Sequence, residues 1–293
     1  FIKMTSIIIQ NKFLYLELSA EMGASVIKFF DKRKKIDIFR PFPKEKRISK
    51  YNSYFTGYFA TAPYFGAIQK KSFFFKNKYI SLPKTHIFEP HTIHGEGWVN
   101  KWKIAKLNQN SVELVFKHNG KNSFPYSYKV KQLFKLSNNS LSISISLENM
   151  DKNNFDCGIG FHPWFNLSKN SKIYSSNFLF LKKKKDNTFS KKKFIKKNYI
   201  DLNKYKTDTT FLNWIGKSKL TINNNLSINI KNKKNVSNLH VYSPAKKNFF
   251  CIEPVTNYRD AYYIKKLGSH FHGLKNLKPK KTFKASVEFE ILN

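Results

Sequence analysis

The segment Leu141-Ser142-Ile143-Ser144-Ile145-Ser146-Leu147 alternates apolar and polar side chains without interruption. Successive side chains of a strand point to opposite faces of a sheet, so this alternation predicts a strand with one buried and one solvated face. The same period recurs at 6–9, 13–18, 226–230 and 285–291. No apolar stripe with helical spacing extends beyond about two turns. The chain is therefore predicted to be almost entirely β-structure.

The segments between these strands favour turns, because they are rich in Asn-Asn, Asn-Gly and Lys-Asn pairs and in Pro. Many short strands joined by turns predict an antiparallel β-sandwich or barrel. No linker or shift in composition divides the 293 residues. We therefore expect a single domain that spans residues 1–293.

The formal net charge of +36 would suit a nucleic-acid-binding protein, because basic faces bind phosphate. However, only four of the 54 basic residues are arginines, and base readout depends heavily on arginine. Lys, Asn, Ile, Phe and Tyr are all abundant and have A/T-rich codons, so genome composition accounts for the charge. We predict no specific nucleic-acid partner. The lysine block at 182–198 is interpreted as a solvated, mobile loop rather than an element that binds lipid or nucleic acid.

Two further features concern the environment of the protein. Cys157 and Cys251 lie in apolar, strand-like runs, and two cysteines in a chain of this length predict buried free thiols rather than a disulfide framework. The first residues lack the apolar core of a signal peptide, and no apolar run approaches the length of a membrane span. We therefore expect a cytoplasmic protein with no membrane partner.

Three stretches far apart in the chain place ionisable groups among aromatic and turn residues. They are HTIHGEGW (91–98), GIGFHPWFNL (158–167) and CIEPVT (251–256). Histidine has the side-chain pKa nearest neutrality, and burial in the apolar run 249–254 should raise the pKa of Glu253 toward the range of a general base. Each group alone could be a core histidine or half of a structural ion pair. Together, next to aromatic rings that could bind the face of a sugar, they favour acid–base chemistry.

The order of these motifs resembles that of a known family. HTIHGEGWVNKW (91–102) resembles the N/H-x-x-HG-x-GW segment of the aldose 1-epimerase (galactose mutarotase) family. GFHPWFNL, within 158–167, is similar to its H-x-YFNL segment, and FFCIEPVTNYRDAYY (249–263) to its C-x-EP-x-T/S…DA-x-N segment. The resemblance implies a galactose mutarotase-like supersandwich. It also implies an isomerase that interconverts the α and β anomers of a free aldohexose without a metal or cofactor.

The resemblance also implies roles for individual residues. Glu253 would be the general base at the anomeric hydroxyl, His162 would protonate the ring oxygen, and His94 would hydrogen-bond the sugar and support that transfer. The pH profile would then be bell-shaped, with Glu253 giving the lower limb and His162 the upper limb. The candidate substrate-binding residues are Asp208, His91, Trp98, Trp164 and Phe65. The expected partner is a free sugar of the glucose or galactose type, bound by a monomer or weak dimer.

One position departs from the family pattern. Ala67 stands where the family usually has an arginine that contacts sugar hydroxyls, and the loss of a guanidinium should weaken or alter substrate binding. A non-catalytic carbohydrate-binding protein, or a sugar-phosphate epimerase on the same fold, is therefore an alternative function.

Two other classes remain as alternatives. A glycoside hydrolase needs two carboxylates, which Glu96 with Glu253 or Asp208 could supply. A zinc site could be formed by His91, His94 and His162, although HTIH lies in a Gly-rich loop and lacks the helical spacing of a metalloprotease motif.

Overall fold

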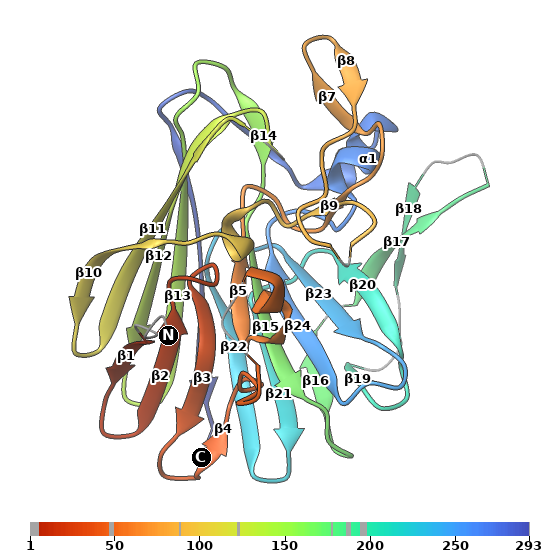
Figure 1. The fold of residues 1–293 in the computed structure, drawn as a ribbon. Coiled ribbons are helices and arrows are strands. Elements are labelled where there is room, and N and C mark those ends of the chain that lie inside the picture. Colours follow the sequence, from red (N-terminus) through yellow and green to blue (C-terminus); the bar gives the residue numbers. More distant parts are fainter. Residues whose placement is uncertain are drawn as a thin grey trace.

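The structure is a computed structural model that describes residues 6–46, 50–87, 89–121, 124–176, 178–185, 189–193 and 198–292. Two large antiparallel sheets dominate it (Figure 1). All five segments with period-2 alternation are strands, as predicted. The chain is therefore an antiparallel β-sandwich, as predicted. The assignment of residues 1–293 to one domain stays a prediction.

The first sheet carries the strands that matter most for the site. Its order is β1 (Ser6–Gln10), β2 (Leu14–Ser19), β3 (Ser25–Asp31), β5 (Tyr58–Thr61), β15 (Gly160–Asn166), β24 (Phe249–Val255), β23 (Asn238–Ser243) and β20 (Thr207–Phe211), with β4 (Ile36–Asp37) paired to β3. Strands distant in sequence, such as β5, β15 and β24, are therefore direct neighbours.

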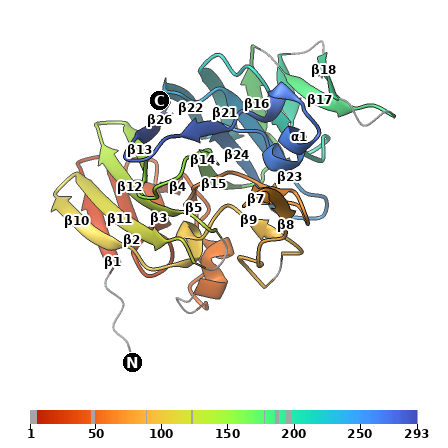
Figure 2. The same ribbon diagram turned by 90° about the horizontal axis from the view of Figure 1, so that it is seen from above.

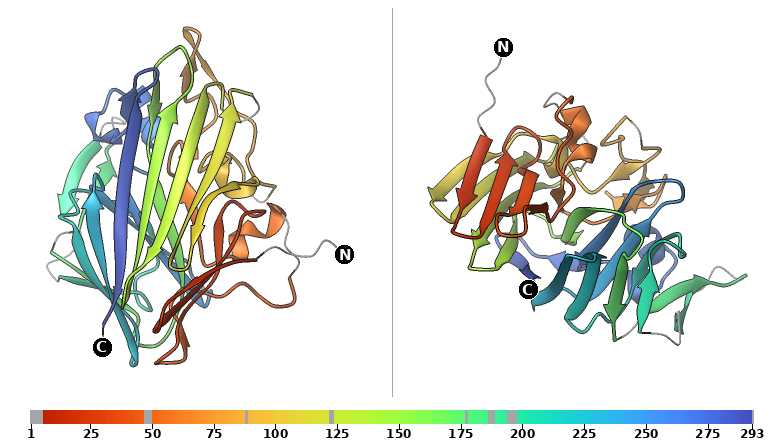
Figure 3. Two further views of the ribbon diagram at one scale, coloured as in Figure 1. Left: turned by 90° about the vertical axis from the view of Figure 1, so that its left-hand side faces the viewer. Right: turned by 90° about the horizontal axis from the view of Figure 1, so that it is seen from below.

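The second sheet contains the longest strands, which Figure 3 (left) shows face-on from yellow to blue. Its order is β10 (Lys103–Asn108), β11 (Ser111–Asn119), β12 (Ser127–Leu136), β13 (Ser140–Asn149), β26 (Thr282–Ile291), β22 (Leu226–Lys234), β21 (Lys217–Asn223), β16 (Lys172–Ser175) and β19 (Tyr199–Asp201). The two strands with the clearest alternation, β13 and β26, pair in the middle of this sheet, with Ile143 opposite Val287.

The main core lies between the two sheets. Phe289 of β26 contacts Phe39 with ring centroids 5.2 Å apart, and Phe39 in turn contacts Phe165 of β15 at 5.4 Å. Tyr58 of β5 meets Phe134 of β12 in the same way, at 5.8 Å. Each buried side chain of this size contributes roughly 1.5–3 kcal/mol when it leaves water. This core fixes the apolar face of the first sheet and directs its opposite face outward.

Short elements extend from the sandwich, as the view from above shows (Figure 2). The paired strands are β6 (Ala67–Ile68) with β9 (Thr92–Ile93), β7 (Phe73–Phe75) with β8 (Lys78–Ile80), β14 (Phe155–Cys157) with β25 (Lys275–Leu277), and β17 (Leu179–Lys183) with β18 (Phe189–Lys193). The helical pieces are η1 (Lys50–Phe55), η2 (Gly97–Val99), α1 (Ala261–Lys266) and η3 (His270–His272). Within the described residues no helix is long and apolar enough to cross a membrane.

Two expectations from the sequence can be compared with these elements. Cys157 and Cys251 are both buried and free, as predicted. The lysine block at 182–198 was interpreted as a solvated, mobile loop, whereas part of its described residues lies in paired strands. Lys183 pairs with Phe189 in a β-hairpin that projects from the body (Figure 1). Its residues 186–188 and 194–197 lie outside the described residues.

Candidate active site

The strands of the first sheet separate core residues from chemical groups by their alternation. In β15, Phe161 and Phe165 belong to the main core, so His162 and Trp164 between them point to the other face. In β24, Ile252 lies in the core and Glu253 faces away from it. The functional groups therefore lie on the face of the sheet that is turned away from the main core.

Strand pairing arranges these outward side chains in two neighbouring rows. In the first row Thr210 is paired with His240 and His240 with Glu253, while His162 is paired with Phe59. In the second row Asp208 is paired with Tyr242, Tyr242 with Cys251, and Cys251 with Trp164. Because directly opposed side chains lie close together, four strands from distant parts of the chain contribute to one site.

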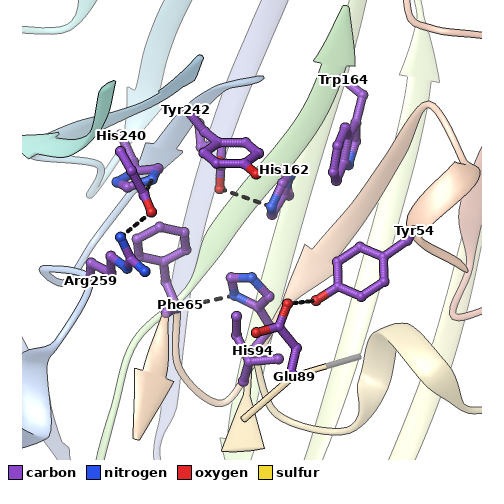
Figure 4. A pocket seen from close by; sticks show the side chains of 13 residues that line it. Tyr54, Phe65, Glu89, His94, His162, Trp164, His240, Tyr242 and Arg259 are labelled. Atoms are coloured by element: carbon purple, nitrogen blue, oxygen red, sulfur yellow. Dashed lines mark hydrogen bonds and ion pairs between the residues drawn. The ribbon is translucent and has the colours of Figure 1, made fainter. Parts of the chain in front are cut away.

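Loops between β5 and β10 cover these rows and enclose a cavity of about 270 Å³ (Figure 4). This volume is near the lower end of the range for small-molecule sites. The lining residues are Tyr54, Phe65, Gly66, Glu89, Ile93, His94, His162, Trp164, Asp208, His240, Tyr242, Glu253 and Arg259. The cavity thus combines several ionisable groups with aromatic rings.

Glu253 and His162 form the central pair. Glu253 Oε2 lies 3.4 Å from His162 Nε2, and both side chains are almost fully buried. Glu253 Oε2 meets no donor with hydrogen-bond geometry among the described residues. Burial, together with the charge of Asp208, raises the pKa of Glu253 well above its usual value. Burial, with the charges of His94 and His240, lowers the pKa of His162 well below 6.5. Both shifts favour the uncharged forms of the pair.

His94 reaches the cavity from an unusual backbone conformation. Its φ of +61° lies in the left-handed region, which few residues other than glycine adopt. The His94 N–H donates to the carbonyl of Gly66 at 3.0 Å, and the Gly66 N–H donates to His94 Nδ1 at 3.1 Å. Burial and the charges of His240 and Arg259 lower the pKa of His94 to about 3. His94 is therefore neutral near pH 7, and since Nδ1 accepts, Nε2 carries the proton.

The end of the cavity at β20 holds a charged network. Arg259 Nη1 forms an ion pair with Asp208 Oδ2, and His240 Nε2 lies 3.1 Å from Asp208 Oδ1. His240 Nδ1 is 2.9 Å from the hydroxyl of Thr210. Burial opposes ionisation of Asp208, but the hydrogen bond and charge of His240 and the Arg259 guanidinium outweigh it and lower the pKa of Asp208. Asp208 is therefore a carboxylate near neutral pH.

Aromatic rings hold the histidines and form apolar walls. Trp164 stacks on His162 with ring centroids 5.1 Å apart and planes at 14°. Phe65 lies 5.5 Å from the ring of His94 and 5.1 Å from that of His240. Figure 4 shows these rings surrounding the space between the labelled side chains. Such walls suit the apolar face of a small polar ligand.

The structure brings together six of the eight residues predicted from the sequence: Glu253, His162, His94, Asp208, Trp164 and Phe65. Trp98 does not line the cavity, and its side chain is completely buried. Its indole N–H donates to the carbonyls of Ile93 and Gly95, so it supports the loop that carries His94. His91 is half-buried and does not line the cavity either.

Sequence reasoning missed seven lining residues: Tyr54, Gly66, Glu89, Ile93, His240, Tyr242 and Arg259. Two of them had a usable signal. In Asn238–Ser243, His240 and Tyr242 alternate with apolar Leu239 and Val241, which places both polar side chains on one face. Tyr54, in the short helical piece η1, and Glu89, in an irregular segment, hydrogen-bond each other, and neither belongs to a sequence motif. Their position depends on the path of the loops.

A metal could be held by one group among the described residues. The ligand atoms of His162, Cys251 and Glu253 all lie within 4.8 Å of one another. Burial and the charge of Glu253 raise the pKa of the Cys251 thiol well above its usual value, which disfavours the thiolate that a metal needs. The set considered from the sequence, His91 with His94 and His162, is not brought together. The donor chemistry therefore fits a proton-transfer pair better than a metal centre.

Glu96, considered as one carboxylate of a glycoside hydrolase, is placed elsewhere. It is buried and lies 3.0 Å from Nδ1 of His118 on β11, and it does not line the cavity. His118 Nε2 is in turn 2.6 Å from the carbonyl of Phe124. The pairing of Glu96 with Glu253 or Asp208 across a glycosidic bond is therefore wrong for this chain.

Comparison with known proteins shows the family to which the chain belongs. Residues 7–290 match the aldose 1-epimerase family, so the chain belongs to that family. The uncharacterized protein YphB of Escherichia coli K12 is 28% identical over 115 residues, which span 39% of each chain.

Solved structures show the same fold. A putative aldose 1-epimerase from Escherichia coli K12 superposes with a TM-score of 0.83 at 18% identity, covering 99% of both chains. A galactose mutarotase-like protein from Clostridium acetobutylicum gives a TM-score of 0.81 at 18% identity, covering 98% of this chain and 94% of that one.

Proposed function

We propose that this protein is an aldose 1-epimerase that interconverts the α and β anomers of a free aldohexose. The observation that carries the proposal is the Glu253–His162 pair, 3.4 Å apart and buried at one wall of a cavity with aromatic sides. Opening a cyclic hemiacetal requires one proton to leave O1 and one to reach O5. Both oxygens are bonded to the same carbon, C1, so two adjacent side chains can exchange protons with them.

In the proposed mechanism Glu253 takes the proton from O1 while His162 delivers one to O5, and the C1–O5 bond breaks. Rotation about C1–C2 in the open aldehyde presents the other face of the carbonyl. Glu253 and His162 then reverse their roles as the ring closes, so that no net proton is gained or lost. Such acid–base groups each contribute about 10²–10⁴ in rate.

The pKa shifts of the pair support these steps. When the ring has opened, Glu253 is protonated and His162 is neutral, and these are the forms that burial favours for each group. The low-polarity wall thus stabilises the pair in the state that accompanies the open-chain aldehyde. His94, neutral and with its proton on Nε2, supplies a hydrogen-bond donor beside them.

The charges of the cavity favour an uncharged sugar over a sugar phosphate. Three carboxyl groups line it (Glu89, Asp208 and Glu253), and the one guanidinium among the lining residues is already paired with Asp208. No lysine is among the described lining residues, although lysine supplies most of the +36 charge of the chain. A phosphate dianion would therefore meet net negative charge, and sites that bind phosphate are built from lysine and arginine.

The deciding experiment is a magnetisation-exchange NMR measurement of α-to-β conversion for glucose and galactose at neutral pH. We expect the protein to accelerate exchange far above the buffer rate, and to act more weakly on the 6-phosphates. Saturable sugar binding without any acceleration would refute the enzyme and favour a carbohydrate-binding protein on the same fold.

A further inference from the structure

The loop after β24 is fixed against the segment that contains Ala67. The side-chain amide of Asn257 accepts a hydrogen bond from the Phe65 N–H at 3.1 Å and donates to the Phe65 carbonyl at 2.9 Å. A Cβ on Gly66 would lie only 1.9 Å from the carbonyl oxygen of Arg259, so glycine is required for this approach. The backbone of Arg259 therefore lies directly beside the residue that precedes Ala67.

The side chain of Arg259 extends from this fixed loop into the cavity. Its Nη1 pairs with Asp208, while the side chain keeps 41% of its surface exposed. A guanidinium carries five N–H donors in a planar fork, so the ion pair leaves donors that a ligand can use. Asp208 is held from its other oxygen by His240 at 3.1 Å. The two charged groups thus present donors and acceptors side by side.

The other arginines that the structure describes, Arg33 and Arg40, do not line the cavity. Arg33 is paired with buried Asp31. Arg40 lies on the outer side of Trp164, with its guanidinium 4.2 Å from that ring, and it donates to backbone carbonyls. Ala67, for its part, offers only a methyl group.

We propose that Arg259 supplies the sugar-binding guanidinium that Ala67 lacks, and that with Asp208 it recognises two adjacent hydroxyls of the sugar. A hydroxyl both donates and accepts, so neighbouring hydroxyls can satisfy Arg259 and Asp208 together. Asp208 lies on β20, two strands from the Glu253 strand β24. At about 4.8 Å per strand this is about 10 Å, a separation that a sugar ring bridges only with its far hydroxyls and a hydrogen bond at each end, so the recognised hydroxyls are those remote from C1. The inference rests on the proposed function in taking a sugar as ligand.

The test couples Arg259 to single hydroxyls of the ligand. Exchange kinetics are measured for the preferred hexose and its 2-, 3-, 4- and 6-deoxy analogues with wild type, Arg259→Met and Arg259→Lys. We expect Arg259→Met to raise KM by roughly 10- to 100-fold with a smaller change in kcat, as for loss of a charged hydrogen bond. Some deoxy analogues should have a higher KM than the parent hexose with wild type, and for these analogues the difference in KM should disappear in Arg259→Met. If Arg259 has a purely structural role, the difference in KM should remain in the variant.

A matched control is Lys265→Met, which removes a cation paired with Asp156 outside the cavity and should behave like wild type. If Arg259→Met does not fold, Arg259→Lys, which keeps the charge but loses the fork, carries the same comparison. Unchanged KM and unchanged deoxy penalties in the Arg259 variants would overturn the inference while leaving the epimerase intact. If wild type binds sugars without exchanging anomers, the proposed function fails, and the same comparison with calorimetric Kd values still decides the role of Arg259. If wild type binds no aldose, both proposals fall.

Discussion

Replacement of Glu253 by glutamine should lower the rate of anomer exchange and change the stability of the fold in the opposite direction. The amide keeps the shape of the side chain but cannot accept the O1 proton, so we expect a loss of about 10²–10⁴ in kcat. At about 1.4 kcal/mol per tenfold in rate, this raises the barrier by roughly 3–5 kcal/mol. Magnetisation-exchange NMR on the preferred sugar gives the rate directly, and Asn11→Ala, at a surface turn outside the cavity, is a suitable mutagenesis control.

The same substitution should stabilise the fold at neutral pH. The pKa of Glu253 is raised in the folded protein, so the folded state disfavours the carboxylate that the unfolded chain carries above pH 4.5. Stability is therefore lost as pH rises from that value toward the folded pKa, by about 1.4 kcal/mol for each pKa unit of elevation. Glu253→Gln removes this loss, so its Tm should exceed that of wild type at pH 7 and approach it near pH 4. A variant that exchanges anomers at the wild-type rate would refute the catalytic reasoning, and a lower Tm at pH 7 would refute the electrostatic reasoning.

Three further outcomes are expected. The profile of kcat/KM against pH should be bell-shaped with the singly protonated pair active. Burial lowers the pKa of His162 and raises that of Glu253, so the lower limb of the profile should come from His162 and the upper limb from Glu253. This order is the reverse of the one expected from the sequence. A Glu253 carboxyl group that titrates near 4.5 by carbon NMR would contradict it. Trp98→Ala should cost about 3–5 kcal/mol of unfolding free energy in denaturant melts, and Trp164→Ala, at a ring that is also buried, should cost a similar amount. Only Trp164→Ala should in addition raise KM, because Trp164 lines the cavity and Trp98 does not, and an unchanged KM in Trp164→Ala would contradict this distinction. Lys183→Ala should leave the rate of anomer exchange unchanged. The protein should retain DNA or RNA only weakly, and strong nucleic-acid binding with a steep dependence on salt would show that its positive charge has a nucleic-acid partner.

The motifs on single strands could be found from the sequence because their information is local. The alternation in Leu141–Leu147 predicts a strand whichever strand it pairs with, since the period of 2 comes from the backbone itself. The burial of Glu253 followed from its apolar neighbours, Ile252 among them. The motif around Trp98 does not distinguish a ring that touches ligand from one that supports the adjacent His94 loop. That difference appears only when the side chain is seen to be completely buried.

Strand period, turn residues and motif order all lie along the chain, so the sequence alone predicts the β-sandwich class and the proposed acid–base residues Glu253, His162 and His94. The position of Arg259 in the cavity beside Ala67 could not be predicted in this way, because it depends on the close approach of two loops 192 residues apart, joined by the hydrogen bonds of Asn257. The pairing of His240 with Glu253 likewise depends on the register of β23 against β24. Register and loop contacts follow from packing between distant segments, and the physical information for them is spread over the whole core rather than written at either residue.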